Sequence, residues 1–153
     1  MTRKQCMLEL KGFLPQKLTK ECNVVVMPDF FLDRIITLPW DAEEFSRLIG
    51  DIVSRKGGSL DGVPQTDIKG GNAINVASAL SSLGVNVTPI VCTSELGQQQ
   101  IKYHFNNRPI NLSHVKTCGK ASTTTALEFK NKEEKTNVML RDLGSLAEFG
   151  PAD

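Results

Sequence analysis

The 153-residue sequence has no hydrophobic run that approaches the length of a membrane span, which needs about 20 consecutive apolar residues. The N-terminal segment 1–22 also lacks an uninterrupted apolar core of signal-peptide length. Neither sign of charge is in excess, because 18 basic and 17 acidic side chains leave a net charge of +1. The sequence therefore gives no electrostatic reason to expect nucleic acid or a membrane surface as a partner.

Metal-ligating patterns are missing as well. The four cysteines, Cys6, Cys22, Cys92 and Cys118, form no CxxC or zinc-ribbon spacing, and the only two histidines lie ten residues apart. We therefore expect no metal site. We also expect all four cysteines to be reduced thiols, as in a cytoplasmic protein.

The familiar phosphate-binding loops are absent too. No GxxxxGK[ST] pattern occurs, and the segment after the first expected strand reads "PDFFLD" where a dinucleotide site would carry GxGxxG. These absences argue against a P-loop enzyme and against a dinucleotide-dependent oxidoreductase.

What is present is a regular alternation of strand and helix patterns. The run "NVVVM" is continuous and β-branched, which is typical of a parallel strand buried on both faces. The expected elements are a strand at 23–27, a helix at 41–56, a helix at 72–83, a strand at 85–92 and a helix from about 97 to 106. This order predicts an α/β fold with parallel pairing.

Both of the first two helices carry boundary signals and an apolar stripe. Asp41 and Glu44 form a capping box for the first, and Gly84 is the expected C-terminal stop of the second. Apolar residues recur at helical spacing in each. We expect the buried stripe of the second helix to comprise Ile74, Ala77, Leu80 and Leu83, and the stripe of the first to comprise Phe45, Leu48, Ile49, Ile52 and Val53.

The ends of the chain differ from the middle. We interpret residues 1–22 as an N-terminal extension with one short helix that Pro15 interrupts. Residues 122–130 and 136–142 read as two strands of an antiparallel hairpin, joined by the charged turn "NKEEK".

The stretch "GGNAINVASALSSLG", residues 70–84, holds the main functional signal. Gly70 and Gly71 let another group approach the backbone closely, and the first N–H groups of a helix are free to bind a ligand. The amides of Asn72 and Asn75 add donors and acceptors that suit a neutral, polyhydroxylated ligand. A tight strand-to-helix turn with capping amides explains the same residues without any ligand.

This stretch resembles the N-terminal signature of the PfkB/ribokinase family of carbohydrate and nucleoside kinases. "PDFFLD" resembles the family's Gly-Asp-x-x-x-Asp motif, with Pro28 in place of the glycine. The segments 108–129 and 142–153 resemble those that lead into and follow a lid strand. The resemblance runs from about residue 23 to the C-terminus, with its segments in family order.

The resemblance implies a ribokinase-like α/β fold, here the N-terminal part of a mostly parallel sheet with helices and a small β lid. The partial domain spans 23–153, with lid segments at about 57–69 and 123–141. It places the ligand-facing carboxylate on Asp33 and further sugar contacts on Gly70, Gly71, Asn72 and Asn75. Asp29 and Phe31 are secondary candidates, and Phe31 stands where ribokinase-like members carry a sugar-binding asparagine, so that its ring could stack on a sugar or a nucleobase.

The family's catalytic aspartate lies in a Gly-Ala-Gly-Asp turn, and this sequence contains no such turn. We therefore expect no catalytic residue here, and expect the base and the site for ATP and Mg in a C-terminal half that is missing or is a separate chain. The resemblance implies a sugar or nucleoside as ligand and a possible homodimer through the lid. Two alternatives remain open: a non-catalytic binding module or regulatory subunit with the same pocket, and an unrelated α/β scaffold.

Overall fold

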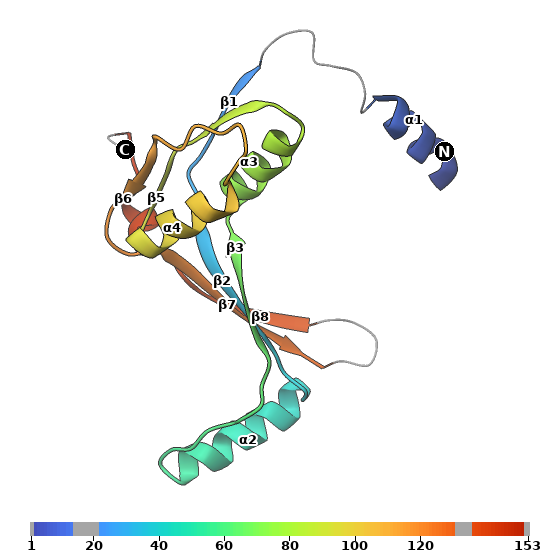
Figure 1. Cartoon of the computed structure of the whole chain (residues 1–153). Helices are drawn as coiled ribbons and strands as arrows, with labels where there is room; N and C mark the ends of the chain where they lie inside the picture. Colours follow the sequence, from blue (N-terminus) through green and yellow to red (C-terminus); the bar gives the residue numbers. More distant parts are fainter. Residues whose placement is uncertain (1, 14–21, 131–135, 152–153) are drawn as a thin grey trace.

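The computed structural model describes residues 2–13, 22–130 and 136–151. A bundle of short strands and two helices forms one part, and a long four-stranded sheet extends from it (Figure 1). In chain order the elements are α1 (Arg3–Phe13), β1 (Asn23–Val26), β2 (Phe31–Thr37), α2 (Ala42–Ser54), β3 (Gln65–Gly70), α3 (Asn72–Ser82), β4 (Asn86–Pro89), β5 (Val91–Thr93), α4 (Glu95–His104), β6 (Val115–Thr117), β7 (Ser122–Phe129), β8 (Thr136–Asp142) and the 3₁₀ helix η1 (Gly144–Glu148).

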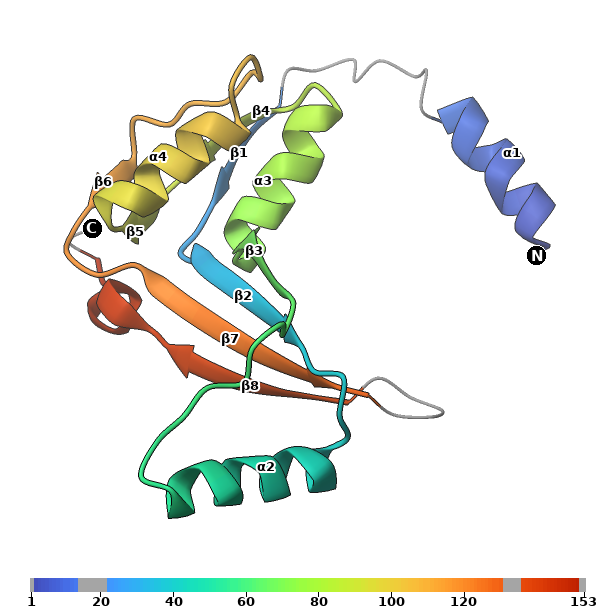
Figure 2. The ribbon, with the colours of Figure 1, turned by 60° about the horizontal axis from the view of Figure 1, so that its bottom comes forward.

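The core lies where two pairs of parallel strands meet α3 and α4. β1 pairs with β4, and β5 pairs with β6, both in parallel. Figure 2 shows α3 and α4 on the same side of these strands. The parallel pairing predicted from the alternation of elements is confirmed. The buried cluster comprises Val26, Phe30, Ala73, Ile74, Ala77, Val85, Val87, Val91, Ile101, Phe105 and Val115.

The second layer is a four-stranded sheet with the order β3-β2-β7-β8. β2 pairs antiparallel with β3 and parallel with β7, and β7 pairs antiparallel with β8. The predicted hairpin of residues 122–130 and 136–142 is therefore confirmed. Its charged turn, residues 131–135, lies outside the described residues. β2, which the lid boundaries expected from the sequence did not include, is a central strand of this sheet.

β1 is less buried than its sequence predicts. Val24 packs against the core and Val26 is 8% exposed, whereas the intervening Val25 is 58% exposed. Successive side chains of a strand point to opposite faces, and α3 and α4 cover one face only (Figure 2). The prediction that the strand at 23–27 is buried on both faces is therefore wrong for the described chain.

Helix α2 has its predicted capping box, and its apolar side chains are at most partly buried. The Asp41 carboxylate accepts the Glu44 N–H at 2.8 Å, and the Asp41 N–H donates to the Glu44 carboxylate at 3.4 Å. No residue of α2 is buried. Phe45 contacts the rings of Trp40 and Phe129, with centroids 6.4 and 5.8 Å away. The apolar stripe thus predicted the helix correctly. The described residues cover this stripe only in part.

The other helices differ from the predictions at their margins. In α3, Ile74 and Ala77 are buried as expected, but Leu83 is 63% exposed because the helix has ended before it. Gly84 has a φ of +80°, which fits its role as the C-terminal stop. α4 begins at Glu95 rather than near Gly97, because the Ser94 hydroxyl caps it and accepts the Gly97 N–H at 3.2 Å.

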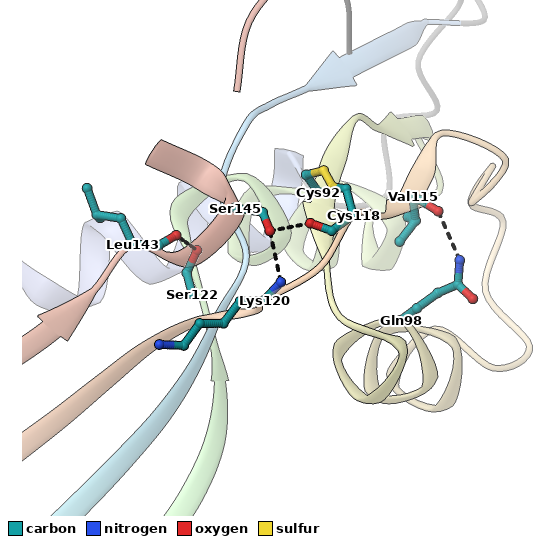
Figure 3. Close-up of a disulfide and its surroundings, with 8 residues drawn as sticks. All are labelled: Cys92, Gln98, Val115, Cys118, Lys120, Ser122, Leu143 and Ser145. Carbon is teal, nitrogen blue, oxygen red and sulfur yellow. Dashed lines mark hydrogen bonds between the residues drawn. A yellow bond between two sulfur atoms is a disulfide. The ribbon is translucent and has the colours of Figure 1, made fainter. Parts of the chain in front are cut away.

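The cysteines correct the expectation of four reduced thiols. The structure pairs Cys92 with Cys118 in a disulfide, with Cα atoms 5.9 Å apart, and leaves Cys6 and Cys22 free (Figure 3). The pairing follows from the sheet, since Cys92 lies on β5 and Cys118 directly follows its neighbour β6. Spacing alone could not reveal it, because 26 residues separate the two cysteines.

The N-terminal helix α1 ends at Phe13, and none of its residues is buried. Pro15, which was expected to interrupt this helix, lies outside the described residues. Among the described residues no helix is both long enough and apolar enough to span a membrane.

Candidate functional site

One face of the four-stranded sheet carries the residues that the sequence singled out. Paired residues of neighbouring strands place their side chains on the same face. The register therefore sets Asp33 of β2 in one row with Ile68 of β3, Thr124 of β7 and Arg141 of β8. We call this the acceptor face. It places a carboxylate, a hydroxyl and a guanidinium side by side on three adjacent strands.

Gly70 creates the space that Asp33 occupies. A Cβ built on Gly70 would overlap the Asp33 carboxylate, so only glycine fits while Asp33 keeps this position. Gly70 thus makes room for the Asp33 carboxylate to lie against its backbone.

The Asp33 carboxylate has one oxygen without a partner. Its Oδ1 atom is buried, yet it accepts no hydrogen bond from any described residue. Most buried polar atoms in folded proteins are hydrogen-bonded, because leaving one unpaired costs about 1–3 kcal/mol. An unpaired carboxylate oxygen on this face is therefore a strong candidate acceptor for a ligand's hydroxyl groups.

The second glycine has a different role. Gly71 has a φ of +92°, and a Cβ there would lie 2.5 Å from the carbonyl oxygen of Asp29 and 2.8 Å from Cα of Phe30. This close approach lets the Asp29 carboxylate accept the N–H groups of Asn72 and Ala73, each at 2.7 Å. Asp29, 43 residues before Asn72, thus caps α3.

This capping changes the expected role of the helix N-terminus. The sequence suggested that the free N–H groups of α3 would bind the ligand directly, but two of them already donate to Asp29. The structure thus gives Gly71 and Asp29 a structural role in setting the position of Asn72.

A pocket of about 320 Å³ lies over the acceptor face. Of the seven candidates from the sequence, five line it: Asp29, Phe31, Asp33, Gly71 and Asn72. Gly70 lies beneath Asp33 and does not line the pocket. Neighbouring strands add residues that the sequence analysis missed, namely Ile35, Ile68, Thr124, Ala126, Glu128, Asn137, Met139 and Arg141.

Asn75 is not brought to this pocket. Its side-chain oxygen accepts a hydrogen bond from the Lys69 ammonium at 2.9 Å. By the strand alternation Lys69 points away from the acceptor face, so Asn75 is bonded toward the opposite side of the sheet. Burial is the main cause that lowers the pKa of Lys69, and the charge of Arg108 lowers it further.

Phe31 is not available to stack on a ligand in this arrangement. It is 3% exposed, and the guanidinium carbon of Arg141 lies 4.8 Å from the centre of its ring. Stacking of this kind is a favourable cation–π contact. Arg141 thus presents its planar group to the pocket in place of the ring.

Of the pocket residues that the sequence analysis missed, Thr124 could have been found from a sequence pattern, whereas Arg141 could not. Thr124 belongs to the alternating strand "STTTALEF", and its face could be assigned once Asp33 was placed and the parallel pairing of β2 with β7 was known. Nothing in the sequence pairs Arg141 with Phe31, because they lie on strands separated by β7.

Residues 56–152 match the family model described as pfkB family carbohydrate kinase. The chain belongs to the pfkB family of carbohydrate kinases. No curated protein matches it.

Solved structures share its ribokinase-like α/β fold. A nucleoside kinase of Methanocaldococcus jannaschii is 16% identical with a TM-score of 0.59. The match covers 84% of this chain and 40% of that kinase. A nucleoside kinase of Burkholderia thailandensis in complex with inosine is 14% identical with a TM-score of 0.59, and the match covers 83% of this chain and 38% of that kinase. A ribokinase of Arabidopsis thaliana complexed with ribose and ATP is 13% identical with a TM-score of 0.59, and the match covers 82% of this chain and 37% of that ribokinase. The chain thus spans about two fifths of the length of these kinases.

Proposed function

We propose that this chain is the substrate-binding half of an ATP-dependent kinase that phosphorylates a hydroxyl of a carbohydrate or nucleoside. The observation that carries the proposal is the buried, unpaired Oδ1 atom of Asp33 in a pocket that Asn72 also lines. Membership of the pfkB family and the fold shared with nucleoside kinases and ribokinases support it.

The chemistry of the pocket suits a polyhydroxylated acceptor. A carboxylate accepts hydrogen bonds from two neighbouring hydroxyl groups, and such charge-assisted bonds are stronger than neutral ones. The Asn72 amide offers both a donor and an acceptor at the pocket rim. Thr124, next to Asp33 in the same row, supplies a hydroxyl that donates or accepts. Together these groups would hold the acceptor and orient one of its hydroxyl groups.

The remaining candidates have weaker support. Asn75 holds Lys69 through its amide oxygen, so a sugar contact by this residue would use the remaining hydrogen-bonding capacity of its amide. Asp29 would act by fixing α3 and hence Asn72. Gly70 would act through the position it allows Asp33.

The lid sheet would exclude water from the bound acceptor. β7 and β8 carry Thr124, Asn137, Met139 and Arg141 along the same wall of the pocket as Asp33, so the sheet as a whole would shield a bound acceptor. Shielding of this kind keeps a transferring phosphoryl group away from water.

For the nucleotide, the proposal relies on the family. ATP with Mg would supply the phosphoryl group, and relatives of this fold include a ribokinase of Cryptococcus neoformans in complex with ADP. The described residues contain no group of three or more His, Cys, Asp or Glu that could hold a metal ion. The acceptor-binding residues are what we propose this chain would contribute.

Titration calorimetry with a panel of sugars and nucleosides tests the proposal. At least one neutral polyol should bind, and Asp33→Asn should weaken it by about ten- to a hundredfold, since a hydrogen bond to a charged group contributes about 1.5–3 kcal/mol. Asp61→Asn, an exposed aspartate that lines neither pocket described, is the matched control. Equal affinities of wild type and Asp33→Asn would remove Asp33 from the site.

A coupled assay for ATP-dependent phosphorylation separates the proposal from the alternative of a non-catalytic binding module. We expect the purified chain to bind the acceptor without turnover. Addition of a separately expressed C-terminal half from the same protein should restore turnover if the chain is part of a kinase. Binding that never leads to turnover with such a partner would instead favour the binding module.

A further inference from the structure

A second, larger pocket lies on the opposite side of the four-stranded sheet, facing α4. Its volume is about 800 Å³, within the range of small-molecule sites. Side chains that alternate away from the acceptor face line it from the sheet, including Leu32 and Lys69. Gln99, Tyr103 and His104 line it from α4. The walls thus combine apolar surface with amides and basic groups.

Lys69 enters this pocket from β3. Its ammonium donates one hydrogen bond to the Asn75 side chain at 2.9 Å. An ammonium has three protons to donate, so this neutral partner leaves both the charge and further donors of Lys69 available. No carboxylate among the described residues pairs with it.

His104 lines the same pocket as Lys69, and Arg108, which does not line it, is tied to His104 through the Ser78 hydroxyl of α3. The Ser78 hydroxyl lies 3.0 Å from Nε2 of His104 and accepts a hydrogen bond from Arg108 at 3.3 Å. Arg108 also donates to the Ser82 hydroxyl at 3.0 Å. These bonds fix both side chains, and none of their partners is charged.

The three basic groups lie within one another's electrostatic field. The pKa of His104 is lowered by burial first, and then by the charges of Lys69 and Arg108. A cluster of partly buried cations is unfavourable without a compensating negative charge.

The acids at this pocket are already engaged or point elsewhere. Asp67 lines it but is held by Arg34 in a two-bond ion pair of 2.7 and 2.9 Å. Asp33 contributes to the wall, yet its side chain belongs to the acceptor face by the strand alternation. The described residues therefore leave the positive charges of Lys69 and Arg108 uncompensated, with the His104 ring beside them.

We propose that Lys69, His104 and Arg108 form a binding site for the oxyanion group of a small molecule, with a phosphate group as the best fit. A phosphate offers oxygens in several directions, and the three side chains approach from β3, from α4 and from the turn after α4. The amides and apolar side chains of α4 and β2 would contact the rest of the molecule. This pocket shares Asp33, Ile68 and Thr124 with the acceptor pocket, but Lys69 and His104 line it alone, and the proposal does not rest on the proposed kinase function.

Calorimetry with inorganic phosphate at constant ionic strength tests the site, with acetate as a carboxylate probe and ribose 5-phosphate compared with ribose. Phosphate and ribose 5-phosphate should bind more tightly than acetate and ribose. Lys69→Met and Arg108→Met should each weaken phosphate binding about tenfold or more, as expected for loss of a charged hydrogen bond. Lys102→Met is the matched control, because the Lys102 ammonium donates to Gln98 on α4, and Lys102 neither lines the pocket nor bonds to Ser78 as Arg108 does.

Nuclear magnetic resonance gives a second test, in which phosphate binding is measured on the wild-type protein. Phosphate should raise the pKa of His104, because a bound anion favours the protonated ring, while the exposed His114 should not respond. His104→Gln assigns the signal.

Two outcomes would overturn the proposal. One is a His104 signal that does not respond to phosphate in the range where calorimetry detects binding. The other is phosphate binding that survives Lys69→Met but is lost in Arg141→Met, which would place the anion in the acceptor pocket instead.

Discussion

The Asp33 carboxylate lies against the backbone of Gly70, in the space that any side chain on residue 70 would fill. The two residues occupy neighbouring strands of the sheet, Asp33 on β2 and Gly70 on β3. Because Gly70 has no Cβ, the Asp33 carboxylate can lie against the backbone of residue 70. There its Oδ1 atom is buried and has no hydrogen-bond partner among the described residues.

Gly70→Ala should damage the acceptor site by displacing Asp33. Forcing an extra carbon into a filled space costs about 1–3 kcal/mol, so we expect a lower free energy of unfolding and weaker acceptor binding together. Chemical denaturation and calorimetry measure the two effects. Gly50→Ala, in α2 where nothing lies within 4 Å of the added carbon, should not destabilise the protein.

Asp29→Ala should destabilise α3 from a distance. It removes the carboxylate that accepts the N–H groups of Asn72 and Ala73, and loss of a helix N-cap costs about 0.5–2 kcal/mol. Urea denaturation gives the change in unfolding free energy. Asp61→Ala is the comparison for loss of an exposed acid, and equal effects of the two changes would contradict the capping role.

Cys118→Ser should lower stability because it removes the disulfide with Cys92. This bond closes the segment that contains α4 and β6, and disulfides of similar span stabilise by about 2–4 kcal/mol. The residues after Cys118 lead into β7 and bond to η1, where Ser145 donates to the Cys118 carbonyl and accepts the Lys120 N–H (Figure 3).

Mass spectrometry after alkylation checks the same disulfide directly. Unfolded, non-reduced protein should take up label at Cys6 and Cys22 only. Labelling of all four cysteines would show that the bond does not form, and Cys22→Ser is the control for loss of a free thiol.

Asp67 should make stability depend on pH in the acid range. The hydrogen bonds and charge of Arg34 lower its pKa from the ordinary value of 3.8. A lowered folded-state pKa means that the pair stabilises the fold above about pH 3.8, and that this contribution is lost as the pH falls through the lower value. Wild type should therefore lose stability more steeply below pH 4 than Asp67→Asn. Parallel curves for the two proteins at low salt would contradict this pairing.

Local sequence signals determined most of the individual elements. Asp41 and Glu44 specify the start of α2, and Gly84 specifies the end of α3, because each acts on backbone groups within a few residues. The hairpin of β7 and β8 was predictable from its alternation and intervening polar turn. The sequence also indicated the family and five of the residues that line the acceptor pocket.

Tertiary structure decided what those residues contact. Asp29 caps a helix 43 residues away, Arg141 covers Phe31 from a strand that is not its neighbour, and Asn75 bonds Lys69 rather than lining the acceptor pocket. These contacts depend on which strands pair and in which register. Since a shift of one residue in register moves a side chain to the other face of a sheet, the face on which Asp33, Thr124 and Arg141 meet is fixed by strand pairing, which no local pattern specifies.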